Sequence, residues 1–178
     1  VGFTFAPSTD QARVFVKLEY PTSYDLDRTI QRVRIVEERL KDVPELKHVL
    51  SAIGKVEGVI GQSTQGVYLA QLLLTFSERD ERAITIDEIQ TEIRKRLAGY
   101  PECIITVTQP AIIGGQNQDV ELEIAGDELA TLDRLAVETQ TRAGRIEGIK
   151  DADTTAREGK PELAVVPQRT VLADLNVS

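Results

Sequence analysis

The stretch ARVFVKLEYPTSYDLDRTIQRVRIVEERL, residues 12–40, decides the fold that the sequence predicts. Its first nine residues, 12–20, alternate between apolar and polar side chains. Val14, Val16 and Leu18 fall on one face, which is the two-residue period of a β-strand. The pattern then changes to the period of a helix. The stretch therefore predicts a strand followed by an amphipathic helix that packs on a sheet.

The helix is expected to begin near Ser23 or Asp25, because both side chains can accept a hydrogen bond from the first helical amides. Its predicted apolar stripe consists of Leu26, Ile30, Val33 and Leu40, with Val36 at its edge.

The same two periods continue to about residue 110. Strands are expected over residues 48–53, 67–76 and 103–108. A second helix is predicted from Thr85, which forms a capping box with Glu88, to about Ala98. The order is β-α-β-β-α-β, so the sequence predicts an α+β protein with a ferredoxin-like unit.

The pattern restarts after an expected linker over residues 110–118. A strand is predicted over 119–125, then a helix capped by Asp127, then a strand-like run over 149–155. A further strand over 162–166 and the start of a helix over 169–175 are also expected. Val43–Val49 and Ile146–Ala152 end corresponding strand-helix segments, which indicates an internal repeat at an offset of about a hundred residues.

Composition excludes several classes of function. The 178 residues carry a formal net charge of −8 and have a pI of about 4.8, which argues against nucleic-acid binding. No apolar run approaches the roughly 18 residues of a membrane span. One cysteine cannot form an internal disulfide. Met is absent, so we expect a processed chain or a piece of a longer one.

The sequence offers little for catalysis or metal binding. His48 is the sole histidine and is expected at the surface, so no catalytic triad and no two-histidine metal site is predicted. Cys103 is expected to be a small buried hydrophobe. We predict no catalytic residue, no metal ligand and no cofactor.

Two features are candidates for binding. Residues 54–66 are expected to form a long glycine-rich loop, and loops of that length are often functional. Phe15 and Lys17 share the strand face away from Val14, and Tyr68 stands on a later strand of similar pattern. Such a face can line a binding cleft or pack against another subunit, and the sequence alone does not rank the two.

The order of several short motifs resembles one family. Phe5-Ala6-Pro7-Ser8-Thr9-Asp10-Gln11 precedes an apolar strand that ends Glu19-Tyr20-Pro21. The later motifs, in order, are Gly66-Val67, Gln109-Pro110-Ala111-Ile112, Ile124-Ala125-Gly126-Asp127 and Lys160-Pro161-Glu162-Leu163. Together they resemble the segment after the seventh membrane helix of AcrB-like efflux transporters of the resistance-nodulation-division (RND) family.

The resemblance implies a domain plan. Residues 1–109 would be the first porter-like subdomain of the transporter's second half, 119–159 the opening βαβ of the next, and 160–178 the truncated start of a docking-like subdomain. It further implies the periplasmic portion of an inner-membrane, proton-driven pump that exports drugs or other amphiphilic small molecules. The partners would be a periplasmic adaptor (membrane fusion) protein and an outer-membrane channel, and the full-length protein would be a homotrimer.

The resemblance also implies site residues. The glycine-rich loop falls at the family's switch loop, represented here by Gly54, Lys55, Gly58, Gly61 and Gly66. The candidate substrate-binding residues are Phe15, Lys17, Leu50, Ala52, Tyr68, Ile105 and Val107. Multidrug members usually carry several aromatic residues near these places, so the low aromatic content of 4% favours an aliphatic pocket or a different substrate. The lack of Met counts against copper or silver, which prefer thioether ligands.

Two alternatives remain open at this stage. Tandem ferredoxin-like domains also serve as small-molecule-binding regulatory modules, although such a module should have a complete second unit. An acylphosphatase-like enzyme would need an arginine near the first strand-helix turn, and residues 20–26 contain none.

Overall fold

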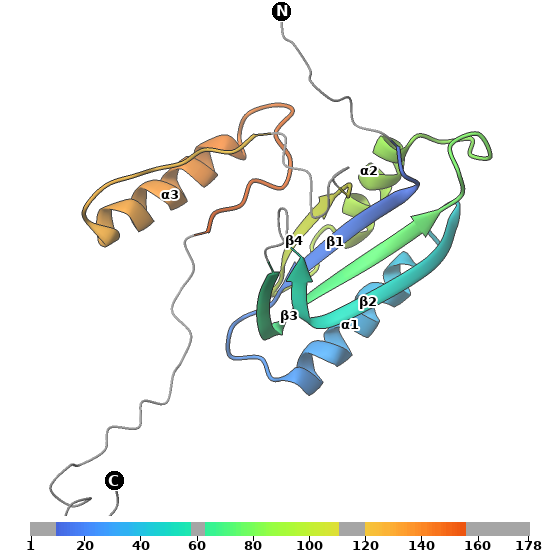
Figure 1. Ribbon diagram of the computed structural model, residues 1–178, viewed down its shortest axis with the longest axis horizontal. Helices are drawn as coiled ribbons and strands as arrows, with labels where there is room; N and C mark the ends of the chain where they lie inside the picture. Colours follow the sequence, from blue (N-terminus) through green and yellow to red (C-terminus); the bar gives the residue numbers. More distant parts are fainter. Residues whose placement is uncertain (1–9, 58–62, 111–119, 156–178) are drawn as a thin grey trace, which may run out of the picture.

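The computed structural model describes residues 10–57, 63–110 and 120–155 (Figure 1). In chain order the elements are β1 (Arg13–Glu19), α1 (Leu26–Leu40), β2 (Leu46–Glu57), β3 (Ser63–Phe76), α2 (Ile86–Leu97), β4 (Ile104–Thr108) and α3 (Leu129–Ala143). None of the helices in these ranges is long and apolar enough to cross a membrane.

One four-stranded sheet has the order β2-β3-β1-β4, and every neighbouring pair is antiparallel. β1 and β3 are therefore the central strands, while β2 and β4 form the two edges. Helix α1 connects β1 to β2 across β3, and α2 connects β3 to β4 across β1. This confirms the predicted α+β class and the β-α-β-β-α-β order of the first 110 residues.

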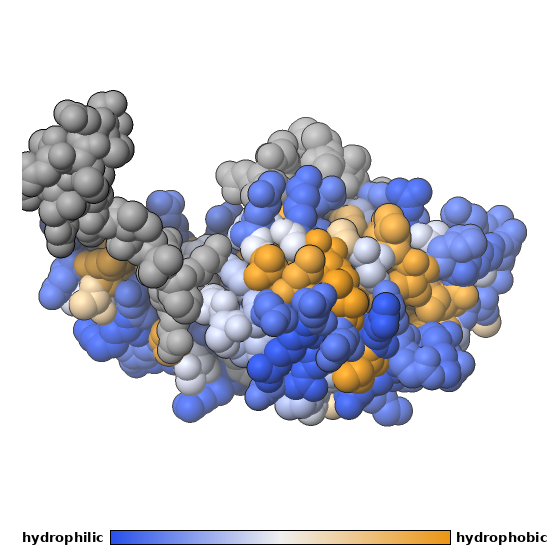
Figure 2. Space-filling model, turned by 90° about the horizontal axis from the view of Figure 1, so that it is seen from below, coloured by the Kyte–Doolittle hydropathy of each residue, from blue (hydrophilic) through white to orange (hydrophobic). Residues whose placement is uncertain are grey.

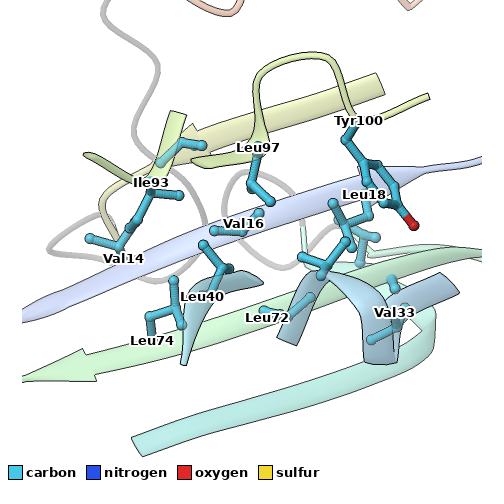
Figure 3. Close-up of a cluster of buried hydrophobic side chains, with 14 of the residues drawn as sticks. Val14, Val16, Leu18, Val33, Leu40, Leu72, Leu74, Ile93, Leu97 and Tyr100 are labelled. Carbon is cyan, nitrogen blue, oxygen red and sulfur yellow. The ribbon is translucent and has the colours of Figure 1, made fainter. Parts of the chain in front are cut away.

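The core lies between one face of the sheet and helices α1 and α2. Val14, Val16 and Leu18 point toward the helices and are fully buried, as the alternation predicts. Figure 3 shows them packed among side chains of both helices and of β3. The other labelled residues are Leu72, Leu74, Val33, Leu40, Ile93, Leu97 and Tyr100. The opposite face of the sheet carries no helix among the described residues.

Helix α1 begins where predicted but buries a different stripe. The Asp25 side chain accepts a hydrogen bond from the Arg28 amide at 2.8 Å, so Asp25 is the N-cap. The predicted stripe is wrong at its start, because Leu26 is exposed and Thr29 is buried instead. The Thr29 hydroxyl donates to the Asp25 carbonyl at 2.9 Å, which satisfies its polar group in the interior. The buried residues of α1 are Thr29, Val33, Val36 and Leu40.

The capping box of α2 is confirmed. The Thr85 amide donates to the Glu88 carboxylate at 2.7 Å, and the Glu88 amide donates to the Thr85 hydroxyl at 3.3 Å. Both bonds satisfy amides that the first helical turn leaves without partners. The helix ends at Leu97, and Gly99 follows with a φ of +70°.

The glycine-rich loop predicted over residues 54–66 is much shorter. β2 continues to Glu57 and β3 begins at Ser63, with Lys55 paired to Gln65. The sequence prediction failed because it took glycines as loop signals, whereas Gly54 lies inside a strand at an irregularity in the pairing. Gly58 and Gly61 lie outside the described residues.

The second half contains the predicted helix without its predicted strands. Residues 120–125 and 149–155 form no strand, because alternation marks a face but a strand also needs a neighbour to pair with. The cap is also wrong: α3 starts after Glu128 rather than Asp127, and no side chain caps it. The expected elements at 162–166 and 169–175 lie outside the described residues, as does nearly all of the expected linker.

The internal repeat is confirmed in local geometry. The Val43 amide donates to the last residue of α1 at 3.0 Å, and the Ile146 amide donates to the last residue of α3 at 3.0 Å. Two residues later, Glu45 has a φ of +63° and Gly148 a φ of +94°. The two helices therefore end in the same turn, which needs a left-handed residue at the same place.

Candidate functional site

The candidate site is the sheet face opposite the helices, which we name the open face. Strand pairing fixes which residues share it. Phe15 lies opposite Leu73, which in turn lies opposite Leu50 of β2. Thr108 of β4 extends this row on the other side of Phe15. The row is mainly apolar and crosses all four strands.

The neighbouring row of the open face is polar. Lys17 lies opposite Gln71 of β3 and Thr106 of β4, and Gln71 lies opposite Ala52 of β2. Of the seven predicted substrate-binding residues, the structure therefore brings Phe15, Lys17, Leu50 and Ala52 together in two adjacent rows.

The other three predicted residues lie on the helix side of the sheet. Val107 lies opposite Val16, and Ile105 lies opposite Leu18, which places both toward the core. Tyr68 is also a core residue and is buried. The expectation that Tyr68 shares a face with Phe15 is wrong, because it stands two residues before a residue that pairs with Leu18.

Lys17 has acidic neighbours on the open face. Its ammonium nitrogen lies 3.4 Å from a Glu19 carboxylate oxygen and 3.8 Å from one of Asp153. All three side chains are partly buried. Asp153 belongs to the segment after α3, so that segment reaches the same face as β1.

The β2–β3 hairpin bends over the open face at two glycines. Gly54 has a φ of +89°, which other residues rarely adopt. A Cβ at Gly66 would lie 2.6 Å from a carbon of the Tyr68 ring, so no larger residue fits there without movement. Beyond the bend, the Glu57 amide donates to the Gln71 side-chain oxygen at 2.8 Å. The predicted switch-like segment is thus largely a bent hairpin arm, which carries Lys55 exposed to solvent.

Gln71 is a residue of this face that the sequence analysis missed. It is buried, and its side-chain nitrogen has no partner among the described residues. A signal was present, since Gln71 is the one polar residue within the run of residues 67–74 apart from Tyr68. A lone amide in an otherwise apolar strand marks a point where that strand meets something polar.

Apolar side chains remain exposed on the first 110 residues. Seen from below, the molecule carries apolar patches between hydrophilic residues (Figure 2). The exposed large apolar residues before residue 110 are Leu26, Ile35, Val49, Leu50, Val67 and Ile104. Leu50 is the most exposed of these at 66%, and it lies on the open face.

The two residues with catalytic potential are far less prominent. His48 is exposed, as predicted. Cys103 packs against the core, and burial raises the pKa of its thiol to about 12. Within the described ranges, no three His, Cys, Asp or Glu side chains are grouped closely enough to hold a metal ion.

Comparison with known proteins identifies the family. The sequence model of the AcrB/AcrD/AcrF family matches residues 1–178. The chain belongs to this family. The predicted resemblance to AcrB-like RND transporters is therefore confirmed, and a family of transporters argues against the regulatory-module and acylphosphatase-like alternatives.

Individual relatives agree. The chain is 24% identical to Protein HelA of Legionella pneumophila over 180 residues, which is 97% of this chain and 17% of HelA. Two crystal forms of a heavy metal efflux pump have a similar fold at 15% identity. Form II gives a TM-score of 0.71 over 98% of this chain and 19% of the pump, and form I gives 0.74 over 95% and 18%. The chain thus spans less than a fifth of these relatives.

Proposed function

We propose that this chain is part of the periplasmic porter of a proton-driven efflux pump in the inner membrane. The observation that carries the proposal is the family match over the whole chain. In this proposal residues 1–109 form one porter subdomain, 119–159 begin the next, and 160–178 begin a docking subdomain. The full-length pump is a homotrimer that works with a periplasmic adaptor and an outer-membrane channel.

A heavy-metal cation is the first candidate substrate. The two similar solved structures are both described as a heavy metal efflux pump, and the acidic balance of this chain favours cationic solutes. Glu19 and Asp153 place carboxylate oxygens on the open face beside Lys17. With no Met in 178 residues, oxygen-binding divalent cations suit this chain better than copper(I) or silver(I).

An amphiphilic molecule, such as a drug, is the second candidate. The row of Leu50, Leu73 and Phe15 supports it, because exposed apolar surface next to the charge of Lys17 matches a molecule with both characters. The two candidates depend on different parts of the open face, so substitutions can separate them.

The test is a growth assay on cells that lack the gene encoding this chain and carry it back in wild-type or variant form. We expect the wild-type gene to raise tolerance to divalent heavy metals. If it raises tolerance only to amphiphiles, the second candidate replaces the first. If it changes tolerance to neither class, the proposed function is refuted.

A matched pair of variants tests the open face. Leu50→Ser and Ile35→Ser both remove an exposed apolar side chain, but Ile35 lies on α1, away from the open face. For an amphiphilic substrate, Leu50→Ser should lower tolerance and Ile35→Ser should not. For a metal substrate, Lys17→Ala should alter tolerance, while both serine variants should behave like wild type. Equal effects of Leu50→Ser and Ile35→Ser would contradict a binding role for the open face.

A further inference from the structure

The free edge of the sheet at β4 is closed by side chains. β4 has β1 as its single neighbour, so its outer backbone groups lack a strand to pair with. At Val107 both outer groups are nevertheless bonded. The Val107 amide donates to the Asp151 carboxylate at 3.1 Å, and its carbonyl accepts from the Arg94 guanidinium at 2.7 Å.

Arg94 and Asp151 also bind each other. The Arg94 Nε lies 2.8 Å from the same Asp151 oxygen that accepts the Val107 amide. Arg94 is on α2, whereas Asp151 comes from the segment that follows α3. A residue of the second repeat therefore completes the hydrogen bonds that an adjacent strand would otherwise provide to β4.

The segment around Asp151 makes two more contacts. Asp153 lies beside Lys17 on the open face, and the Ala152 carbonyl accepts from the Gln140 side chain of α3 at 3.1 Å. Residues 150–154, which we name the strap, thus connect α3 to the β4 edge and to the open face. The two ion pairs that hold the strap, Arg94–Asp151 and Lys17–Asp153, both cross between the repeats.

We propose that the strap is a detachable clamp that joins the second repeat to the first, with Asp151 as the positioning residue that latches it. Release of Asp151 frees the β4 edge at Val107 and withdraws Asp153 from Lys17. The side chains of Arg94 and Asp151 keep 25% and 19% of their surface exposed, so water can replace the contact when it opens. The clamp stands on geometry alone, while its consequence for transport rests on the proposed function.

Amide hydrogen exchange of Val107 tests the clamp directly in the 178-residue chain. In Asp151→Ala the Val107 amide loses a charged acceptor, and we expect it to exchange about tenfold faster or more. Amides of β1, which has neighbours on both sides, should keep their rates. Asp133→Ala on exposed helix α3 is the matched control and should leave Val107 unchanged. An unchanged Val107 rate in folded Asp151→Ala would overturn the proposal.

A second measurement needs no variant. The ion pairs of the strap are partly exposed, so salt should screen them more than it affects the core. Raising NaCl from about 0.05 M to about 1 M should therefore speed exchange at Val107 relative to β1. Exchange that stays equally slow at both salt concentrations would contradict a detachable clamp.

Crosslinking in the full-length pump tests the consequence for transport. Arg94→Cys with Asp151→Cys is joined by a reducible bifunctional thiol reagent, and the high pKa of Cys103 keeps that thiol slow to react. We expect export to stop on crosslinking and to return on reduction. Full export by the crosslinked pump would show that the clamp need not open. A pump that exports nothing before crosslinking would instead contradict the proposed function.

Discussion

The ion pair between Asp10 and Arg82 offers the sharpest test of how this fold is held together. Arg82 lies between β3 and α2, and its side chain is completely buried. One Asp10 oxygen pairs with its guanidinium, and the other accepts the Ala12 amide at 2.9 Å. The Nε and Nη1 groups of Arg82 have no partner within the described part of the chain. Asp10 is therefore the carboxylate that compensates this buried charge.

The expected energies follow from which partner is removed. Asp10→Asn leaves a buried guanidinium without a counter-charge, which should lower the free energy of unfolding by about 3–5 kcal/mol. Replacing both partners, in Asp10→Asn with Arg82→Met, removes the buried charge as well. Apolar replacement of a whole buried pair is often close to neutral, so the double variant should be at least about 2 kcal/mol more stable than Asp10→Asn.

Urea unfolding of the wild type, the two single variants and the double variant measures this as a double-mutant cycle. Far-UV circular dichroism is a suitable signal, because the chain contains no Trp but has two helices packed on its core. A loss below about 1 kcal/mol in Asp10→Asn would refute the account. So would a double variant that is no more stable than Asp10→Asn.

Three further outcomes are expected. Thr85→Ala should cost about 1 kcal/mol in urea unfolding. Because hydrogen bonds from Thr85 lower the pKa of Glu88 below its ordinary 4.5, that contribution is present above this pH and is lost as the pH falls through the lower folded value. The same unfolding measurement should show a loss of about 2–5 kcal/mol in Leu72→Ala and under about 0.5 kcal/mol in Leu50→Ala, and equal losses would contradict the assigned burial. Burial raises the pKa of Cys103 from 9.0 to about 12, so at pH 8 its reaction with a thiol reagent should be about 10³-fold slower in the native chain than in urea. A comparable rate in both would show that Cys103 is not protected.

The first repeat was predictable because its signals are local. The alternation of Val14, Val16 and Leu18 identifies the core face of β1, and Thr85 with Glu88 locates the start of α2. The same approach failed for residues 120–125. Their alternation is genuine, but whether a segment becomes a strand depends on a neighbouring strand, which local pattern does not encode.

The candidate site was predictable in part for the same reason. A two-residue period places Phe15 and Lys17 on one face, and the structure confirms it. It does not show which face the helices cover, so Tyr68 was assigned to the wrong side. The bond from Val107 to Asp151 joins residues 44 positions apart, and only the folded chain brings them together.

Export itself is the most direct test of the central claim, that this chain belongs to the porter of an efflux pump. Cells that carry or lack the encoding gene are loaded with a divalent heavy-metal cation or, separately, with a fluorescent amphiphile. The rate at which each substrate leaves the cells is then measured with and without an uncoupler of the proton gradient. The account predicts faster loss of at least one substrate when the gene is present, and no difference once the uncoupler is added. Equal rates of loss in both strains for every substrate would contradict it.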